Sequence, residues 1–314
     1  MMVKENIDLK NHSNYKIGGK ARLFLVPKNG EEVKEAVAIA RKDKLPIFIL
    51  GGGTNLLISD SGFAGAVIKP EIKILEVNGA DIRVGAGVLM SDLLNFAAEK
   101  GLSGLEWAGG LPGTVGGAIR GNAGAFAGET KDSLKEVISL DISGTPELVK
   151  RNNAECEFGY RNSIFKMNDG KEIILEATLS LKKGDKKSIQ SAIEEKIKYR
   201  KERHPMEYPN IGSIFKNVDL KLVPKAILPQ LQHVIKNDPF PVVPTAYLIS
   251  ECGVKGVSWG GAMISPKHPN FIVNVLDAKS DDVKTLIKLV KAAVKEKFEI
   301  ELEEEVIYVN GHKN

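Results

Sequence analysis

The sequence predicts an α+β protein with more than one domain. The chain has 314 residues, which exceeds the size at which a single hydrophobic core usually keeps growing. Hydrophobic residues make up 43% and charged residues 27%, as in globular proteins, which excludes disorder or collagen-like repetition as a description of the whole chain. Helix and strand patterns alternate at the start, short strands dominate the middle, and a helix and a strand close the last third.

The predicted elements follow from hydrophobic periodicity and from helix-capping residues. The segment 31–44 has Val33, Ala36, Val37 and Ala40 on one helical face. Ser91 is expected to cap a second helix that ends at Lys100. The predicted helices are 31–44, 91–100, 188–203 and 281–298, and the predicted strands are 46–50, 66–68, 81–88, 136–142, 172–181 and 303–309. The stretch 224–244 holds five of the 14 prolines and is predicted to be a surface excursion.

Glycine is concentrated in the first part of the chain. It accounts for 31 residues, of which 21 precede residue 129 and ten lie between Gly101 and Gly128. Glycine is used where the backbone turns sharply or comes close to another group. We therefore expect 101–128 to be a long loop region with a function, because structureless loops of that length are otherwise uncommon in compact domains.

Two glycine runs are candidates for binding a cofactor. The first is Leu50-Gly51-Gly52-Gly53-Thr54-Asn55, which follows a predicted strand. Its backbone N–H groups could form an anion nest for a pyrophosphate, or the run could be only a tight turn. The second runs from Gly109 to Ala118, and so many glycines are entropically costly. Close approach to a large flat or phosphorylated cofactor explains this second run better than a plain loop does.

Net charge and cysteine content limit the kinds of ligand, metal site and disulfide that we expect. A net charge of +4 over this length suits a small anionic ligand better than a nucleic-acid groove, which needs clustered basic residues. Cys156 and Cys252 are too few for a zinc site or a disulfide framework, so we expect reduced thiols in the cytoplasm and no metal. Neither a secretory signal nor an apolar run of roughly 18 residues is evident, so we expect no membrane association.

The ordered motifs resemble those of the UDP-N-acetylenolpyruvoylglucosamine reductase family, in the subtype that lacks an extra substrate loop. The resemblance spans about residues 12–309. Its motifs are Gly51–Leu57 with Asp60, Gly62 and Phe63; Leu111–Gly117; Asn122–Ala125; Tyr160–Lys166; Gly212–Asn217; Gly260–Ala262; Lys267–Asn274; and Glu303–Val306.

The resemblance implies a three-domain flavoprotein with an FAD-binding fold of the vanillyl-alcohol-oxidase (PCMH) type and an α+β substrate-binding domain. The implied parts are an FAD-binding subdomain over 1–70 with 300–314, a second one over 71–184, a connector helix over 185–208, and a substrate-binding domain over 209–299. The implied activity is NADPH-dependent, FAD-mediated reduction of UDP-N-acetylglucosamine enolpyruvate to UDP-N-acetylmuramate in peptidoglycan synthesis. A cytoplasmic monomer is expected, and the FAD should be noncovalent, because Thr54 stands where covalent relatives often have histidine.

The same resemblance assigns roles to individual residues. Arg161 would meet the anionic intermediate, Ser213 would donate the proton, and Glu305 would polarise the intermediate or relay protons. Without the resemblance, a surface arginine would be the favoured interpretation of Arg161, and the basic end of the helix 188–203 could equally be merely solvated. The implied FAD contacts are Gly51, Gly52, Gly53, Thr54, Asn55, Leu56, Pro112, Gly113, Thr114, Gly116, Gly117, Asn122, Ala123 and Gly124. The implied substrate contacts are Tyr160, Arg203, Lys216 and Asn217.

The sequence departs from the family pattern at a few positions. His204, Val218 and Ile307 stand where the family usually has glutamine, proline and arginine, and 210–211 and the excursion before Pro244 also differ. Two other functions compete with the implied one. The first is a different FAD-dependent oxidoreductase of the same superfamily that acts on another sugar or alcohol. The second is a flavin- or nucleotide-binding protein without activity. The combination of Arg161, Ser213 and Glu305 favours the reductase over both.

Overall fold

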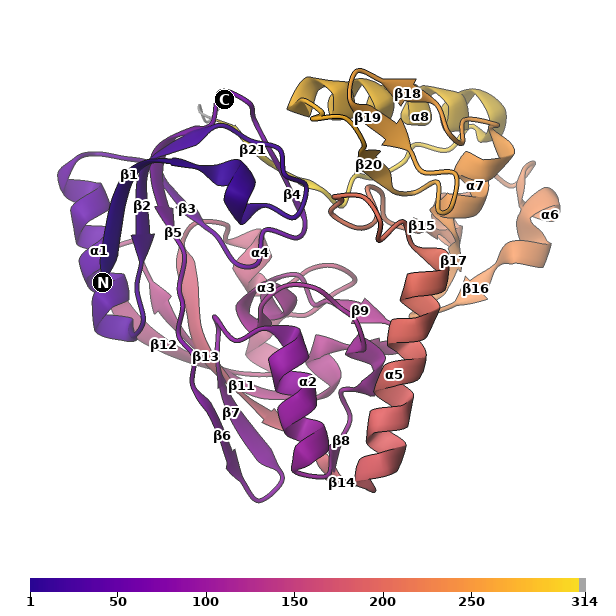
Figure 1. The fold of residues 1–314 in the computed structure, drawn as a ribbon. Coiled ribbons are helices and arrows are strands. Elements are labelled where there is room, and N and C mark those ends of the chain that lie inside the picture. The colour runs from indigo at the N-terminus through magenta and orange to yellow at the C-terminus, as the bar shows by residue number, and fades with distance from the viewer. Residues whose placement is uncertain (311–314) are drawn as a thin grey trace. The chain divides into compact units, whose positions relative to one another are not determined.

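The computed structural model describes residues 1–310 and contains two compact units. Unit 1 comprises Met1–Ile7, Ala21–Gly52 and Ala64–Tyr199. Unit 2 comprises Asp8–Lys20, Gly53–Phe63 and the described residues from Arg200 onward. Both units mix helices with strands, which confirms the predicted α+β class. Figure 1 traces the chain through the elements of each unit.

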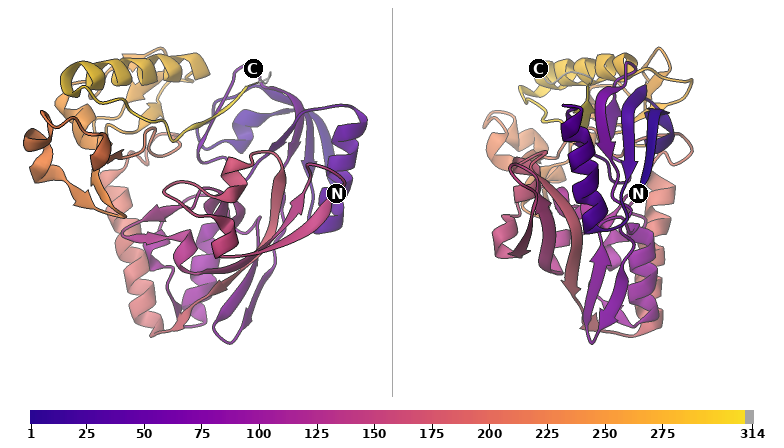
Figure 2. Two further views of the ribbon diagram at one scale, coloured as in Figure 1. Left: turned by 180° about the vertical axis from the view of Figure 1, so that it is seen from behind. Right: turned by 90° about the vertical axis from the view of Figure 1, so that its left-hand side faces the viewer.

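The first layer of unit 1 is a four-stranded sheet in the order β1 (Met2–Asp8), β2 (Lys20–Val26), β5 (Phe63–Ile68) and β3 (Ile47–Ile49). Helix α1 (Gly30–Lys42) lies along this sheet, as Figure 2 shows, and is capped by the Asn29 side chain. The four apolar residues predicted for one face of this helix are fully buried. Strands β3 and β5 are parallel, and residues 50–62 between them form the long connection that a parallel pair requires.

The second layer of unit 1 is an antiparallel five-stranded sheet in the order β12 (Glu147–Asn152), β11 (Leu134–Asp141), β13 (Glu172–Ser180), β7 (Asp81–Gly85) and β6 (Leu75–Asn78). The helices with it are α2 (Met90–Glu99), α3 (Val115–Arg120) and α4 (Ile164–Met167). Two short ladders pair β8 (Leu102–Ser103) with β14 (Lys182–Lys183) and β9 (Gly124–Ala125) with β10 (Gly128–Glu129).

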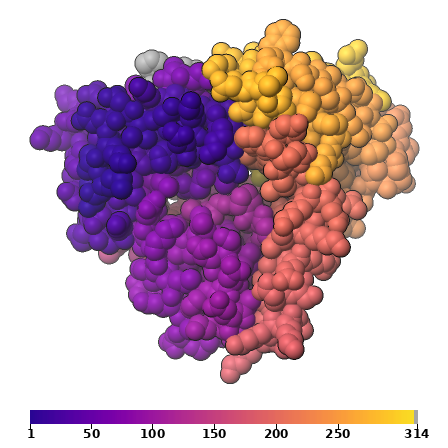
Figure 3. Space-filling model, in the orientation of Figure 1, coloured from indigo at the N-terminus to yellow at the C-terminus, as the bar shows by residue number. Residues whose placement is uncertain are grey.

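Helix α5 (Lys186–Arg203) packs onto the core of unit 1 through Ile189 and Ile193. Most of its other side chains are exposed, and they form a long strip in the space-filling view of Figure 3.

Unit 2 is built around helix α8 (Ser280–Phe298), whose apolar stripe is buried as predicted. The stripe packs with the sheet β18 (Ser258–Trp259), β19 (Ala262–Ile264) and β20 (Ile272–Asn274), and with helix α7 (Thr245–Glu251). A second sheet joins β15 (Val218–Asp219), β17 (Pro241–Val243) and β16 (Lys236–Asn237), with helix α6 (Leu228–Leu231) between β15 and β16 in the chain. Strand β4 (Leu56–Ile58) runs parallel to β21 (Ile307–Val309). The short 3-10 turns of both units are Leu9–His12, Glu106–Ala108, Thr130–Asp132, Ala154–Cys156, Leu220–Leu222 and Gln232–Val234.

Three expected details were wrong. Helix α2 begins one residue before Ser91 and its N-cap is Leu89, without a side-chain cap, because the packing of Met90 and Leu93 sets its start. The region 101–128 is not one loop, since Thr114 caps helix α3 within it, and Gly116 and Gly117 inside that helix concealed the pattern. The last strand begins at Ile307 rather than at residue 303. The proline-rich stretch 224–244 does contain exposed residues such as Lys225 and Pro229, but it also supplies the buried β17 residues Val242 and Val243.

The predicted four-part domain division stays a prediction. The C-terminal strand β21 does pair with β4 from the predicted first part, and both belong to unit 2. Residues 311–314 of the predicted first subdomain lie outside the described residues. No helix within residues 1–310 is both long enough and apolar enough to cross a membrane.

Candidate functional site

The two predicted cofactor loops of unit 1 touch each other through glycine. A Cβ added at Gly52 would lie 2.6 Å from Gly113 Cα, and one added at Gly51 would lie 2.9 Å from Thr114 Oγ1. Gly113 itself has a φ of +110°, a conformation that other residues rarely adopt. These glycines are therefore required by the close packing of the two loops, whatever else they contact.

The glycine turn also offers hydrogen-bond donors. In the described part of the chain, the backbone N–H groups of Gly51, Gly52, Gly53, Thr54 and Asn55 donate to no protein acceptor. A run of N–H groups without an internal partner fits the oxygens of a pyrophosphate. These residues therefore fit the diphosphate of an FAD. Leu56 follows in strand β4, where its backbone pairs with Ile307 and its side chain is buried.

Gly117 is less closely packed than Gly51, Gly52 and Gly116. A Cβ added there would be 3.6 Å from its nearest neighbour, Thr114 Oγ1, which is an ordinary contact. Internal packing therefore does not require glycine at this exposed position on helix α3. Gly116, by contrast, would bring a Cβ within 2.9 Å of Ala86 Cβ.

We predict that Gly52→Ala and Gly117→Ala have opposite effects on the free energy of unfolding. Gly52→Ala should lower the free energy of unfolding by about 1–3 kcal/mol and weaken FAD binding, because the loops must separate. Gly117→Ala should leave stability unchanged or raise it by up to about 1 kcal/mol, since alanine favours helix over glycine. It should nevertheless weaken FAD binding if FAD comes close to this backbone. Thermal unfolding of the apoprotein and FAD titration by flavin fluorescence measure the two effects, and wild-type FAD affinity in Gly117→Ala would remove Gly117 from the cofactor contacts.

Arg161 lies in a strained two-residue turn of unit 1. Gly159 and Asn162 exchange two backbone hydrogen bonds of 3.1 Å, so Tyr160 and Arg161 form the tip of the turn. Arg161 has a φ of +54°, which costs a non-glycine residue on the order of 1 kcal/mol. Such strain is more frequent at functional sites than elsewhere.

The Arg161 guanidinium is held over this turn. Its Nη2 donates to the Gly124 carbonyl oxygen at 2.8 Å, and its Cζ lies 5.1 Å from the centre of the Tyr160 ring. The buried Asn122 side chain donates to the Gly159 carbonyl oxygen and accepts from the Lys131 N–H. Three predicted cofactor or substrate residues, Asn122, Gly124 and Tyr160, therefore support Arg161. The sequence did not indicate this role for Asn122.

Unit 2 brings Ser213, Glu305 and Asn55 together through the backbone. The Glu305 N–H donates to the Ile214 carbonyl oxygen at 2.7 Å, so Glu305 lies beside the residue after Ser213. The Asn55 side chain donates to the Glu305 carbonyl oxygen at 3.0 Å, and the Ile307 N–H donates to the Asn55 carbonyl oxygen at 3.1 Å. The predicted proton donor, the predicted carboxylate and the end of the glycine turn are thus neighbours in one unit.

The two glutamates before Glu305 have polar partners in the structure. Glu303 forms an ion pair with Lys216, with 2.5 Å between Oε1 and Nζ. Glu304 pairs with Lys291 at 2.8 Å and accepts a hydrogen bond from the Tyr308 hydroxyl. Burial, together with Glu304, raises the pKa of Tyr308.

The other predicted substrate contacts have structural partners of their own. Lys216 is paired with Glu303, as described, and Asn217 Oδ1 accepts from the Thr245 N–H at the start of α7. Arg203 is the exposed last residue of α5. None of these contacts excludes a ligand, and their roles at the site stay predictions.

Two partly buried histidines pack together near the end of α5. The rings of His204 and His268 lie 5.3 Å apart, and both contact the Phe271 ring. Burial lowers the pKa of His204 to about 4, helped by the charges of His268, Arg200 and Lys267. Burial also lowers the pKa of His268 to about 4.

We predict that the histidine pair makes stability pH-dependent below pH 6.5. Because the pKa of each histidine is lower in the folded protein, the unfolded chain binds more protons between pH 6.5 and 4. The free energy of unfolding should fall as pH decreases through that window, by on the order of 1 kcal/mol at pH 5 after allowance for solvent screening. Urea unfolding at pH 7 and pH 5 measures it, and His204→Gln should reduce the difference. An equal difference in the variant would contradict the assignment.

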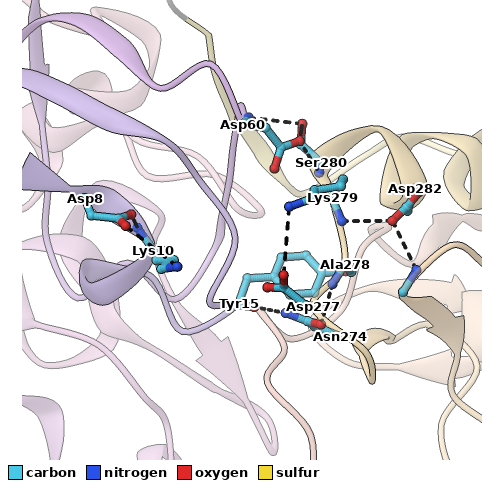
Figure 4. A network of polar contacts seen from close by, with 11 residues as sticks. Asp8, Lys10, Tyr15, Asp60, Asn274, Asp277, Ala278, Lys279, Ser280 and Asp282 are labelled. Atoms are coloured by element: carbon cyan, nitrogen blue, oxygen red, sulfur yellow. Dashed lines mark hydrogen bonds and ion pairs between the residues drawn. The ribbon is translucent and has the colours of Figure 1, made fainter.

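Unit 2 contains a cavity of about 460 Å³ that involves none of the predicted site residues. Its charged lining comprises the lysines Lys10, Lys16, Lys20 and Lys279 and the aspartates Asp8, Asp60 and Asp277. Asp60 accepts from the N–H and hydroxyl of Ser280, the first residue of α8, both at 2.7 Å (Figure 4). Lys10 pairs with Asp8 at 3.8 Å, and Lys279 with Asp277 at 3.9 Å.

Known families match both parts of the chain. Residues 204–309 match the family described as UDP-N-acetylenolpyruvoylglucosamine reductase, C-terminal domain, and residues 21–146 match the family described as FAD binding domain. The UDP-N-acetylenolpyruvoylglucosamine reductase of Clostridium tetani is 37% identical over 312 residues, which cover 99% of this chain and 93% of that protein. The protein of the same name from Caldanaerobacter subterraneus is 38% identical, over 96% of this chain and 91% of its own.

A solved structure is similar over the same length. The crystal structure of the UDP-N-acetylenolpyruvylglucosamine reductase of Thermus caldophilus matches with a TM-score of 0.77 and 31% identity. The match covers 99% of this chain and 100% of that chain.

Proposed function

The chain belongs to the UDP-N-acetylenolpyruvoylglucosamine reductase family, and from this we propose that it reduces UDP-N-acetylglucosamine enolpyruvate to UDP-N-acetylmuramate. The electrons come from NADPH and pass through FAD, and the product serves peptidoglycan synthesis. The observation that carries the proposal is the similarity to reductases of this name along nearly the whole chain, in both its parts.

FAD is the cofactor of this reaction, and the glycine turn suits it. When bound, it supplies hydride transfer, from NADPH to the flavin and from the flavin to the enolpyruvyl double bond. The backbone N–H groups of residues 51–55 would hold its diphosphate. The neighbouring loop of Pro112, Gly113, Thr114, Gly116 and Gly117, together with Asn122, Ala123 and Gly124, would hold the rest of the cofactor.

The chain's own residues would supply a proton and charge stabilisation. Reduction of an enol ether adds a hydride at one carbon and a proton at the other, through an anion conjugated with the carboxylate of the substrate. We assign the proton to the Ser213 hydroxyl, which follows the tight turn at Gly212, where φ is +80°. We assign the substrate anion to the planar guanidinium of Arg161.

Glu305 would polarise the intermediate or relay the proton that restores the Ser213 hydroxyl. The position of its backbone next to Ile214 supports this role. Tyr160, Arg203, Lys216 and Asn217 are proposed to contact the UDP-sugar.

We also propose that the enzyme works as a monomer in the cytoplasm. The free thiols of Cys156 and Cys252 are compatible with a reducing compartment.

Absorbance spectroscopy on the purified protein tests the function. The protein should be yellow, and anaerobic NADPH should bleach the flavin absorbance. Addition of UDP-N-acetylglucosamine enolpyruvate should restore the oxidised spectrum, with one equivalent of UDP-N-acetylmuramate formed. Bleaching without recovery would reject this substrate and favour another oxidoreductase of the superfamily. A colourless protein that FAD cannot reconstitute would favour a binding protein without activity.

A further inference from the structure

Asn270 contacts the segment that carries Ser213 more extensively than any role assigned so far requires. It is 3% exposed and precedes strand β20. Its side chain makes two hydrogen bonds to Phe215: Nδ2 donates to the Phe215 carbonyl oxygen at 2.8 Å, and the Phe215 N–H donates to Oδ1 at 3.0 Å. Its backbone carbonyl oxygen accepts from the Ile214 N–H at 2.8 Å.

These bonds fix the two peptide groups that follow Ser213. The first peptide group is oriented by its Ile214 N–H, which donates to the Asn270 carbonyl oxygen. The second is held from two sides, since its carbonyl oxygen accepts from the Glu305 N–H and its N–H donates to Asn270 Oδ1. The segment 214–215 therefore lies between Asn270 and Glu305, with both peptide planes determined.

The other side of Ser213 is less constrained by packing. Gly212 has a φ of +80°, and a Cβ added there would meet nothing within 4 Å. The Gly212 N–H donates to Asn210 Oδ1 at 3.1 Å, a bond between residues two apart. The direction of the Ser213 side chain therefore depends mainly on the peptide groups after it, which Asn270 holds.

We propose that Asn270 is a positioning residue for the reduction, because it fixes the Ser213 hydroxyl relative to the Glu305 carboxylate. The inference rests on the proposed function, in which Ser213 donates the proton. Asn270 itself is buried behind the segment and acts through it. A displacement of about 1 Å at a reacting group can slow a reaction on the order of 10²-fold, so loss of this clamp should affect the proton-dependent step selectively.

Asn274 provides a matched control four residues away. It is also a buried asparagine whose side chain makes two hydrogen bonds to backbone: Nδ2 donates to the Tyr15 carbonyl oxygen at 3.0 Å, and Oδ1 accepts from the Ala278 N–H at 2.8 Å. Figure 4 shows these two contacts, neither of which involves residues 212–216. Loss of either asparagine should lower stability to a similar degree, but only Asn270 should affect Ser213.

The experiment compares the two half-reactions of the FAD-loaded enzyme by anaerobic stopped-flow spectroscopy. In Asn270→Ala, flavin reduction by NADPH should keep its wild-type rate, and reoxidation by UDP-N-acetylglucosamine enolpyruvate should slow on the order of 10²-fold. The KM for the enolpyruvyl substrate should change little. Asn274→Ala should keep both rates. Asn270→Asp preserves the size and the Oδ1 acceptor but places an oxygen against the Phe215 carbonyl oxygen, so it should show the same selective slowing if Asn270→Ala does not fold.

Three results would overturn the proposal: wild-type reoxidation in both Asn270 variants, equal slowing of the two half-reactions, or equal slowing of reoxidation in Asn274→Ala. The wild-type enzyme, run in parallel, separates this failure from failure of the proposed function. If the wild-type flavin is reduced by NADPH but the enolpyruvyl substrate does not reoxidise it, the function is wrong and the role of Asn270 is rejected with it.

Discussion

Ser213→Ala should leave flavin reduction by NADPH at its wild-type rate and slow reoxidation by the enolpyruvyl substrate by about 10²–10⁴-fold. The reason is that only the second half-reaction needs a proton from the protein. The alanine side chain fits the position, since Ser213 is half-buried and lies next to Gly212, which has open space. Stopped-flow absorbance of the flavin in each half-reaction measures the difference.

Ser258→Ala is the matched control for this prediction. Ser258 is an exposed serine of the same unit, in strand β18, and its hydroxyl makes only a 3.4 Å contact with the Gly256 carbonyl oxygen. The control should keep both rates. If Ser213→Ala slowed both half-reactions equally, the serine would have a structural or binding role rather than the role of proton donor.

Arg161→Ala should lower turnover with the enolpyruvyl substrate by about 10²–10³-fold, the usual cost of losing one donor to a developing anion. The variant should still bind FAD and accept electrons from NADPH. Stability should fall by on the order of 1 kcal/mol, because the contacts with Gly124 and Tyr160 are lost while alanine keeps the strained φ of +54°. Steady-state turnover, the FAD titration and thermal unfolding together separate these effects.

Two further variants sharpen the assignment. Arg161→Lys keeps the charge but loses the planar pair of donors, so it should recover only part of the activity. Arg83→Ala removes an exposed arginine of the same unit, which pairs with Glu176 and Glu76, and should be nearly neutral in turnover. Full activity in Arg161→Ala would show that Arg161 is an ordinary surface arginine without a role in the reaction.

Sequence patterns predicted the long helices and most central strands because their residues repeat with the period of the element. Helices α1 and α8 lie within one or two residues of their predicted ranges, since their apolar stripes directly record which face is buried. Helix α3 was missed for the opposite reason. Its six residues include two glycines and make too short a stripe, and it exists because Thr114 caps it and the surrounding core packs against it.

Sequence patterns likewise revealed some parts of the candidate site and not others. The glycine runs were recognisable from composition, because a local surplus of a residue without a side chain is visible in the sequence itself. The choice of Glu305 among three successive glutamates came only from the family resemblance, since all three have the same chemistry. Only the fold pairs Glu303 and Glu304 with lysines and joins the Glu305 backbone to Asn55 and Ile214.

The sequence alone determined the α+β class, the glycine turns suited to FAD and the family, because these depend on residue types at local spacing. The tertiary structure decided which residues position the proposed chemistry. Asn122 supports the Arg161 turn through Gly159, which is 37 residues away in the sequence, and Asn270 clamps the segment after Ser213 through Phe215, which is 55 residues away. Hydrogen bonds between distant segments produce no periodic pattern in the sequence, because their geometry depends on how the whole chain packs.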